Sequence, residues 1–386
     1  PNYRQAAEKW WHGEQSIYIS KKSGFLYLPH AAIIYTPFVL PPKRIGEPLW
    51  RIVSLTTLAW AIWRSAKILP AYPSTNTFAL LSILTIPSSF ASAANGQMNL
   101  LLSALLLHAT IDLSRNLTIR PLLLLLLATA LKPHALIFLL LVATVFPRFL
   151  LPTLFGTCLF LLAPFIHPKP SYVLNQYTSF SHVLISSTLH IAHEYCDLTG
   201  LARTLGIHLP QTFWFLLRSV AALVTLALAW SATRNHPSPL REFLTLALAT
   251  TYLMLFNPRT EANSYILLTP SVAWLTALLS LPALKTSPPP LPSSPILAHS
   301  SCSRPSNQTK TIQISDKTAT PIVLALYLLS LGSDSYGPIH NWTNLWLKAL
   351  LTLIFALWLA KFCIQSRPSI VTSTSTIKPP PTIPPS

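Results

Sequence analysis

The sequence predicts an all-α protein, a bundle of helices that crosses a membrane several times. Of its 386 residues, 51% are hydrophobic and only 10% are charged, the mean hydropathy is +0.47, and apolar stretches recur along the chain. So few charged side chains cannot cover the surface of a globular protein of this length. A helix that spans a bilayer needs about 20 mostly apolar residues, and several of the stretches reach that length.

Eleven apolar segments account for most of the chain. They are residues 47–63, 75–94, 98–113, 120–131, 134–147, 149–166, 211–230, 241–256, 264–284, 319–332 and 344–363. Two of them, 120–131 and 134–147, are too short to cross a bilayer upright. They meet at Lys132-Pro133-His134, which predicts a bent or partly re-entrant pair.

The composition divides the chain into five regions. These are an extracytoplasmic loop with an interfacial helix (1–46), a transmembrane helical core (47–284), a Pro- and Ser-rich cytoplasmic linker (285–318), a C-terminal two-helix membrane segment (319–364) and a disordered tail (365–386). In the first region, Pro29 and Pro37 interrupt an apolar stretch that is expected to lie on the outer leaflet. Residues 167–210 are expected to form a long outer loop.

The orientation follows from the basic residues, because short loops rich in Lys and Arg stay in the cytoplasm. With residues 1–46 outside, basic residues recur in the inner connections, whereas the loops around Asn95 and Asp334 carry none; Lys21, Lys22, Lys43 and Arg44 are exceptions. This topology places most of the acidic residues outside, namely Glu8, Glu14, Glu47, Glu194, Asp197, Glu261 and Asp334. The formal charge of +17 reflects scattered single residues, so no nucleic acid partner is expected.

Polar residues at the predicted outer ends of the helices are the candidates for binding. A charge at the position of Lys132 costs about 2.5 to 3.5 kcal/mol in the bilayer, and such residues usually face a partner. Lys132, with His134 beside it, is predicted to bind an anionic lipid head, the alternative being a lysine that snorkels to the headgroups. Arg259 has a fork of donors suited to phosphate, the alternative being a surface pair with Glu261.

Further candidates carry amides, hydroxyls or an imidazole that suit sugar groups. Asn263 and Tyr265 follow Arg259 in FNPRTEANSY, Gln97 lies in ANGQMN, and Tyr27 and His30 lie in the interrupted stretch near the beginning. Helix capping at Asn95 and Gly96 is the alternative role for ANGQMN, and a simple anchored loop is the alternative for the stretch around Tyr27.

The sequence predicts neither a metal site nor a cofactor. In HIAHEYCD, His190 and His193 have HxxHE spacing rather than the HExxH of zinc proteases, and Cys158, Cys196, Cys302 and Cys363 are far apart. Hydrolase, nucleotide-phosphatase and dinucleotide motifs do not occur.

These motifs, in their order along the chain, resemble glycosyltransferase family 87. The resemblance is carried by YRQAAEKWWHGEQSIY, LYLPHAAIIYTPFVLPP, EPLW, NGQMN, LKPH and NPRTEANSY, and it covers most of residues 1–284. It implies a GT-C type membrane fold, a polyprenyl-phosphate sugar as donor, a glycan or glycolipid acceptor, and transfer of a hexose, mannose in bacterial members. The expected location is a bacterial plasma membrane, with the active site facing outside.

The resemblance also implies an aspartate that deprotonates the acceptor hydroxyl, directly ahead of the stretch that corresponds to Pro1-Asn2-Tyr3. The first aspartate of this sequence is Asp112, so the catalytic aspartate is expected upstream of Pro1, in a part of the protein that the sequence does not include. A homologue that is inactive, or that uses Glu8 or Glu14, is the alternative. A transporter or lipid flippase and a noncatalytic scaffold are the rival functions.

Overall fold

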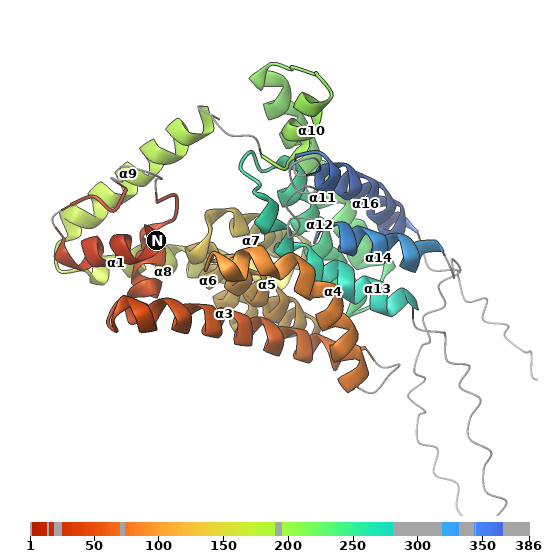
Figure 1. The fold of residues 1–386 in the computed structure, drawn as a ribbon, viewed down its shortest axis with the longest axis horizontal. Coiled ribbons are helices and arrows are strands. Elements are labelled where there is room, and N and C mark those ends of the chain that lie inside the picture. The colour runs from red at the N-terminus through yellow and green to blue at the C-terminus, as the bar shows by residue number, and fades with distance from the viewer. Residues whose placement is uncertain are drawn as a thin grey trace, which may run out of the picture.

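In the computed structural model, residues 2–13, 15–18, 25–69, 74–189, 195–280, 319–331, 343 and 345–365 are described. All regular secondary structure in these ranges is helical, and the helices gather into one bundle (Figure 1). The all-α prediction is confirmed. The predicted linker at 285–318 and all but the first residue of the predicted tail lie outside the described residues.

The first half of the bundle contains nine helices and short 3-10 turns. They are α1 (Asn2–His12), α2 (Pro29–Tyr35), η1 (Thr36–Phe38), α3 (Lys43–Ala66), α4 (Ser74–Ala94), α5 (Asn99–Ser114), α6 (Ile119–Leu131), η2 (Pro133–Ala135), α7 (Leu136–Val145), η3 (Pro147–Phe149), α8 (Leu150–Leu162), η4 (Ala163–Ile166) and α9 (Pro170–Leu189). The second half has α10 (Leu198–Thr204), α11 (Gln211–Asn235), α12 (Leu240–Phe256), η5 (Ala262–Leu267), α13 (Thr269–Ser280), α14 (Ala319–Leu331) and α16 (Leu347–Ile364).

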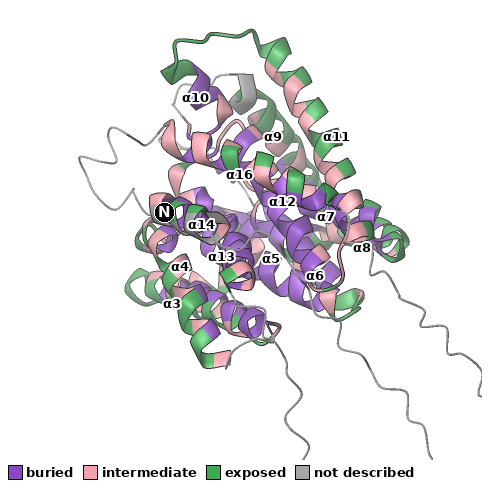
Figure 2. Cartoon of the chain, turned by 90° about the vertical axis from the view of Figure 1, so that its right-hand side faces the viewer, coloured by how far each residue is buried: buried purple, intermediate pink, exposed green. Residues whose placement is uncertain are grey.

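Three helices form the centre of the bundle: α5, α12 and α13. Almost every residue of α5 and α12 is buried, including polar ones, so both helices are surrounded by other helices (Figure 2). The Phe243 and Trp274 rings stack with centroids 3.9 Å apart and join α12 to α13. Buried Thr residues such as Thr250 bond carbonyls in their own helix, which satisfies their hydroxyls without a partner helix.

In the described part of the chain, four helical stretches are long and apolar enough to span a membrane by length and composition. They are Ser74–Ala94, Pro147–Ile166, Gln211–Asn235 and Leu347–Ile364. Only 6% of the residues in the most apolar part of α11 are buried. Phe215, Leu216 and Leu223 expose most of their surface. An apolar helix with so much exposed hydrophobic surface requires lipid around it.

The chain breaks between α6 and α7, at the junction where the sequence predicts a bend. Lys132 is extended, with φ −145° and ψ 121°, and η2 follows before α7 begins at Leu136. Pro133 explains the end of α6, because a residue before proline avoids the helical conformation. Each of the two short helices therefore ends or begins at this polar junction.

Two segments have contacts or structure that the sequence does not indicate. In the stretch around α2, the residues Pro29, His30, Ala31 and Ala32 are buried, because α2 packs against α1, α6 and α9. The expected loop 167–210 contains the 20-residue helix α9. Its buried Tyr172 and Val173 pack into the same core as the α1 residues. These tertiary contacts stabilise α9, whose sequence has no regular apolar pattern that would predict a helix.

Candidate functional site

Most of the predicted binding residues converge at one end of the bundle. We call this group the outer polar cluster, after the side of the membrane that the sequence predicts for it; its members are Tyr3, Tyr27, Gln97, Asn99, Lys132, His134, Arg259, Glu261 and Asn263. They come from α1, the approach to α2, the α4–α5 turn with the first residue of α5, the α6–η2 junction, and the segment that leads into and begins η5. Residues far apart in the sequence therefore supply one site.

Asn99, the first residue of α5, joins two of these segments. Its side chain is fully buried, and its Nδ2 donates to Gln97 Oε1 at 3.0 Å and to the carbonyl and side-chain oxygens of Asn263 at 3.2 and 3.1 Å. Ser92 Oγ also donates to the Asn263 carbonyl, at 2.9 Å. The amide of Asn99 thus fixes the α4–α5 turn against the beginning of η5.

The α4–α5 turn is itself held by α3. Trp50 Nε1 donates to the Gly96 carbonyl at 3.0 Å, and Gly96 has φ +62°, a conformation that favours glycine. The guanidinium of Arg51 lies close enough to contact a Cβ at Gly96, 3.3 Å from its Nε. Gln97 is consequently presented from a turn with little freedom.

Glu261 is the carboxylate of the outer polar cluster. It is exposed, and its Oε2 accepts a hydrogen bond from Gln97 Nε2 at 3.2 Å. Its charge acts on Tyr3, Tyr27 and Lys132, so these groups lie near it. An exposed carboxylate among buried polar groups can accept hydrogen bonds from sugar hydroxyls.

Tyr3 and Tyr27 form a hydroxyl pair in the cluster. Their hydroxyl oxygens are 3.0 Å apart and their ring centroids 5.3 Å apart. Burial raises the pKa of both phenols, and the charge of Glu261 raises it further. Both side chains therefore stay neutral and can donate hydrogen bonds.

Lys132 and His134 supply two nitrogens that the protein leaves available. Within the described ranges, no hydrogen bond or ion pair reaches the Lys132 ammonium, and His134 Nε2 is buried without a hydrogen-bond partner. Burial lowers the pKa of Lys132, and the charge of Glu261 opposes this shift. A partly desolvated ammonium of this kind binds an anion more strongly than an exposed one does.

Arg259 lies two residues before Glu261 in the sequence, and Thr260 between them is fully buried. Its Nε is buried without a hydrogen-bond partner, and the described part of the chain contains no ion pair between Arg259 and Glu261. The alternative of a surface pair is therefore not what the structure forms. The guanidinium keeps donors free for a ligand.

Other predicted residues lie elsewhere. His30 stacks on Phe160, with centroids 3.9 Å apart, and its Nε2 is 2.7 Å from the Phe160 carbonyl, so it joins α2 to α8. The Tyr265 hydroxyl is buried and donates to the Cys196 carbonyl at 2.7 Å. Glu8 is exposed and pairs with Arg4 at 3.5 Å, on the opposite side of α1 from Tyr3.

Glu14 lies outside the described residues, as do His190 and His193. Within the described residues, no group of three or more His, Cys, Asp or Glu side chains could hold a metal ion. Sequence reasoning left Tyr3 and Asn99 out of the predicted site. Asn99 gave one signal, an amide at the beginning of an apolar helix, whereas Tyr3 gave only its place in a motif.

The comparison with known families matches a model described as glycosyltransferase family 87 over residues 25–258, more than half of the chain. The chain belongs to glycosyltransferase family 87. No curated protein and no solved structure gives a significant match. Membership makes the chain a membrane glycosyltransferase that acts on a sugar donor and an acceptor. The matched range contains Tyr27, the α4–α5 turn and Lys132 of the outer polar cluster.

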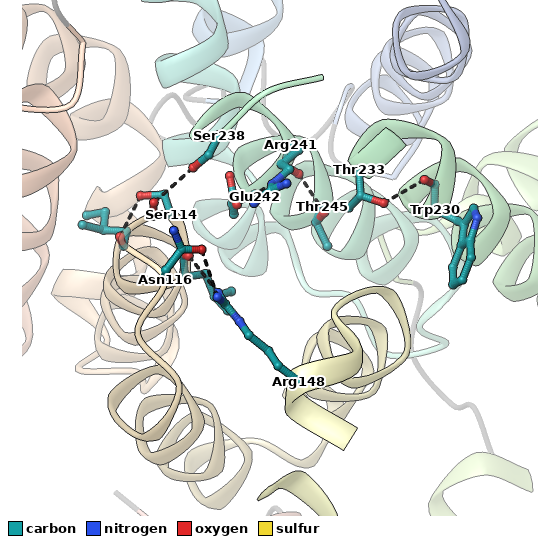
Figure 3. A network of polar contacts seen from close by, with 11 residues as sticks. Ser114, Asn116, Arg148, Trp230, Thr233, Ser238, Arg241, Glu242 and Thr245 are labelled. Carbon is teal, nitrogen blue, oxygen red and sulfur yellow. Dashed lines mark hydrogen bonds and ion pairs between the residues drawn. The ribbon is translucent and has the colours of Figure 1, made fainter. Parts of the chain in front are cut away.

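The family 87 chain has a different polar network at the opposite end of α5, α6 and α12. Buried Asp112 pairs with Arg64 and, at 2.9 Å, with Arg120. Figure 3 shows the neighbouring part, in which Arg148 donates to Asn116 Oδ1 at 2.9 Å and Arg241 Nε lies 2.8 Å from Glu242 Oε1. Here the arginines are engaged with the protein, in contrast to Lys132 and Arg259.

Proposed function

We propose that the protein transfers a hexose, mannose by resemblance, from a polyprenyl-phosphate donor to a glycan or glycolipid acceptor at the extracytoplasmic face of a bacterial plasma membrane. The observation that carries the proposal is the arrangement of the outer polar cluster. It combines the cations Lys132 and Arg259, which form no ion pair with the protein among the described residues, with neutral amide and hydroxyl donors. A sugar phosphate needs both kinds of group.

The cations support the donor class. In the reaction, the acceptor oxygen attacks the anomeric carbon, the bond from that carbon to the phosphate oxygen breaks, and the electron pair stays on the phosphate. The leaving phosphate gains negative charge, so fixed cations stabilise the transition state more than the bound donor. Lys132 provides a point charge and Arg259 a planar fork, both suited to phosphate.

The amides and hydroxyls support sugar binding. Gln97, Asn263, Tyr3 and Tyr27 offer donors and acceptors in fixed positions around Glu261. A general base must take the proton of the acceptor hydroxyl as the new bond to the anomeric carbon forms. At the start of α1, Tyr3 lies in the cluster and can position that hydroxyl.

The distribution of basic residues supports the orientation. Arg64, Arg120, Arg148 and Arg241 all lie at the bundle end opposite the outer polar cluster. Since basic ends of membrane helices stay in the cytoplasm, this arrangement favours a cluster that faces outside.

The test uses Lys132→Gln and Arg259→Gln in the purified protein, reconstituted in lipid nanodiscs with polyprenyl-phosphate mannose. A hydrogen bond to a charged group contributes about 1.5 to 3 kcal/mol, so kcat/KM should fall about 10- to 150-fold for each variant. The matched controls are Lys43→Gln and Arg115→Gln, whose side chains are exposed outside the cluster, and their kcat/KM should stay within about twofold.

Unchanged transfer in both cluster variants would show that the phosphate assignment is wrong. Transfer from a different donor class, with none from the polyprenyl phosphate, would refute the donor. Movement of the lipid-linked sugar across the membrane without transfer would support a transporter instead.

A further inference from the structure

Lys348 occupies an unusual place for a lysine. It is the second residue of α16, it is 1% exposed, and its ammonium lies 3.4 Å from the Ala262 carbonyl and 5.6 Å from the centroid of the Tyr265 ring. The beginning of a helix favours anions, and a buried ammonium loses its hydration. A lysine placed here opposes both preferences, so its contacts with the η5 region need an explanation.

The segment 259–263 is held by backbone contacts from two sides. The Thr260 carbonyl accepts from the Cys196 amide at 2.8 Å and the Ala262 carbonyl accepts from Lys348, both from the C-terminal side of the bundle. The Asn263 carbonyl accepts from Ser92 and Asn99, on the side of α4 and α5. Glu261 lies between these anchored carbonyls.

Tyr265 links the contacts on the C-terminal side. Its hydroxyl donates to the Cys196 carbonyl at 2.7 Å, while its ring lies under the Lys348 ammonium. Lys348, Tyr265 and Cys196 therefore form one unit, which we call the C-terminal clasp. Attraction between the Lys348 ammonium and the Tyr265 ring helps to offset the burial of the lysine.

We propose that Lys348 is a positioning residue of the glycosyltransferase site. Through the Ala262 carbonyl it fixes the segment 259–263, so that Arg259 and Glu261 stay directed at the outer polar cluster. The C-terminal two-helix segment, which lies beyond the residues that the family model matches, is then part of the working site rather than a separate anchor. This role rests on the proposed function of the cluster.

The experiment compares Lys348→Met and Lys348→Arg with Lys361→Met, in the full chain in nanodiscs. Lys361 is exposed near the other end of the same helix, which makes it a matched control. Amide hydrogen exchange is measured at Cys196 and Ser264, whose amides donate to Thr260 and Glu261 carbonyls. Lys348→Met should accelerate exchange about tenfold at both amides, with Lys348→Arg within about threefold of the parent and Lys361→Met unchanged.

Transfer kinetics with polyprenyl-phosphate mannose provide the second measurement. Lys348→Met should lower kcat/KM about tenfold, with recovery of at least half of the loss in Lys348→Arg, because Arg259 and Glu261 are displaced and not removed. If Lys348→Met does not fold, Lys348→Gln replaces it under the same criteria.

Exchange that is unchanged in Lys348→Met would overturn the proposal. Faster exchange with unchanged kinetics would reduce the clasp to a structural role and overturn the positioning role. If the parent protein transfers no sugar from this donor, the proposed function fails, whereas the exchange comparison still decides whether Lys348 fixes the segment.

Discussion

Replacing Asn99 by alanine removes the amide that joins the α4–α5 turn to the beginning of η5. The side chain is fully buried, and its Nδ2 lies within 3.2 Å of three acceptor oxygens, one on Gln97 and two on Asn263, and 3.5 Å from Ser92 Oγ. The Asn263 carbonyl keeps its bond from Ser92, and Gln97 keeps its bond to Glu261. The change therefore weakens the junction without removing all of its contacts.

The magnitude follows from those contacts. A net hydrogen bond contributes about 0.5 to 1.5 kcal/mol, and a buried group left without its partner costs about 1 to 3 kcal/mol. The Asn263 carbonyl keeps its bond from Ser92, whereas Gln97 Oε1 and Asn263 Oδ1 lose the bond from Asn99, so we expect Asn99→Ala to lower the free energy of unfolding by about 1 to 3 kcal/mol. Small displacements of positioned groups can lower rates by up to about 100-fold, so kcat/KM for the donor should fall at least about tenfold.

Unfolding in mixed detergent and SDS micelles measures the stability, and transfer assays in nanodiscs measure kcat/KM. The matched control is Asn235→Ala. Asn235 Nδ2 also donates to three oxygens, on Ser231, Cys363 and Ile364, but at the other end of the bundle. It should lose similar stability and keep its kcat/KM within about twofold.

Equal kinetic losses in the two variants would refute this reasoning, because the effect of Asn99 would then be general destabilisation. An Asn99→Ala protein that matches the parent in both measurements would show that the junction is not fixed by this amide.

Three further predictions concern stability in the same unfolding assay. Asp112→Ala should cost about 3 to 5 kcal/mol, because the buried Arg64 guanidinium loses its carboxylate partner. Gly46→Ala should cost about 1 to 3 kcal/mol, because a Cβ at this position would lie 2.0 Å from the Phe38 carbonyl oxygen. Burial raises the pKa of Asp197, so the folded state binds the carboxyl proton more tightly than the unfolded state does. The free energy of unfolding should therefore increase as the pH falls from neutral toward the pKa of Asp197. Asp197→Asn should make this increase smaller.

Each of these has a comparison within the chain. Glu8→Gln removes an exposed carboxylate and should change stability by less than about 0.5 kcal/mol. Gly156→Ala meets only the flexible ends of Leu122 and Leu126, so it should cost less than Gly46→Ala does. If Asp112→Ala were as stable as Glu8→Gln, the argument for the buried ion pair would be wrong. A larger loss of stability in Gly156→Ala than in Gly46→Ala would contradict the steric argument. Equal slopes of stability against pH in the parent and in Asp197→Asn would contradict the argument from the pKa of Asp197.

The sequence predicts the helices better than it predicts the contacts between them. Hydrophobic length marks each apolar segment, because a helix in lipid must satisfy its own backbone and needs an apolar exterior. Lys132 and Arg259 stand out as predicted binding residues because a charge near a bilayer needs a partner. The structure places both at one end of the bundle, and its described part contains no ion pair to either of them.

Two residues of the same type can have different roles that only the tertiary structure reveals. Tyr27 and Tyr265 both lie in predicted site motifs, yet Tyr27 lies in the cluster, whereas the Tyr265 hydroxyl donates to the Cys196 carbonyl. Lys348 carries no signal, because a lysine at the start of a membrane helix is normally a headgroup contact. Its role depends on Ala262, a residue that shares no motif with it. Long-range contacts of this kind leave no periodic pattern in a sequence.

The bond from Asn99 to Asn263 spans 164 residues of sequence, and this separation affects biosynthesis. At about 5 to 20 residues per second, a ribosome needs on the order of 8 to 33 seconds to make the intervening chain. During this interval Asn263 has not yet been synthesised, so the Asn99 side chain cannot donate its hydrogen bonds to it. Water, a lipid headgroup or the insertion machinery must occupy that place, and the later arrival of η5 must displace it. The site is therefore one of the last parts of the nascent protein to close.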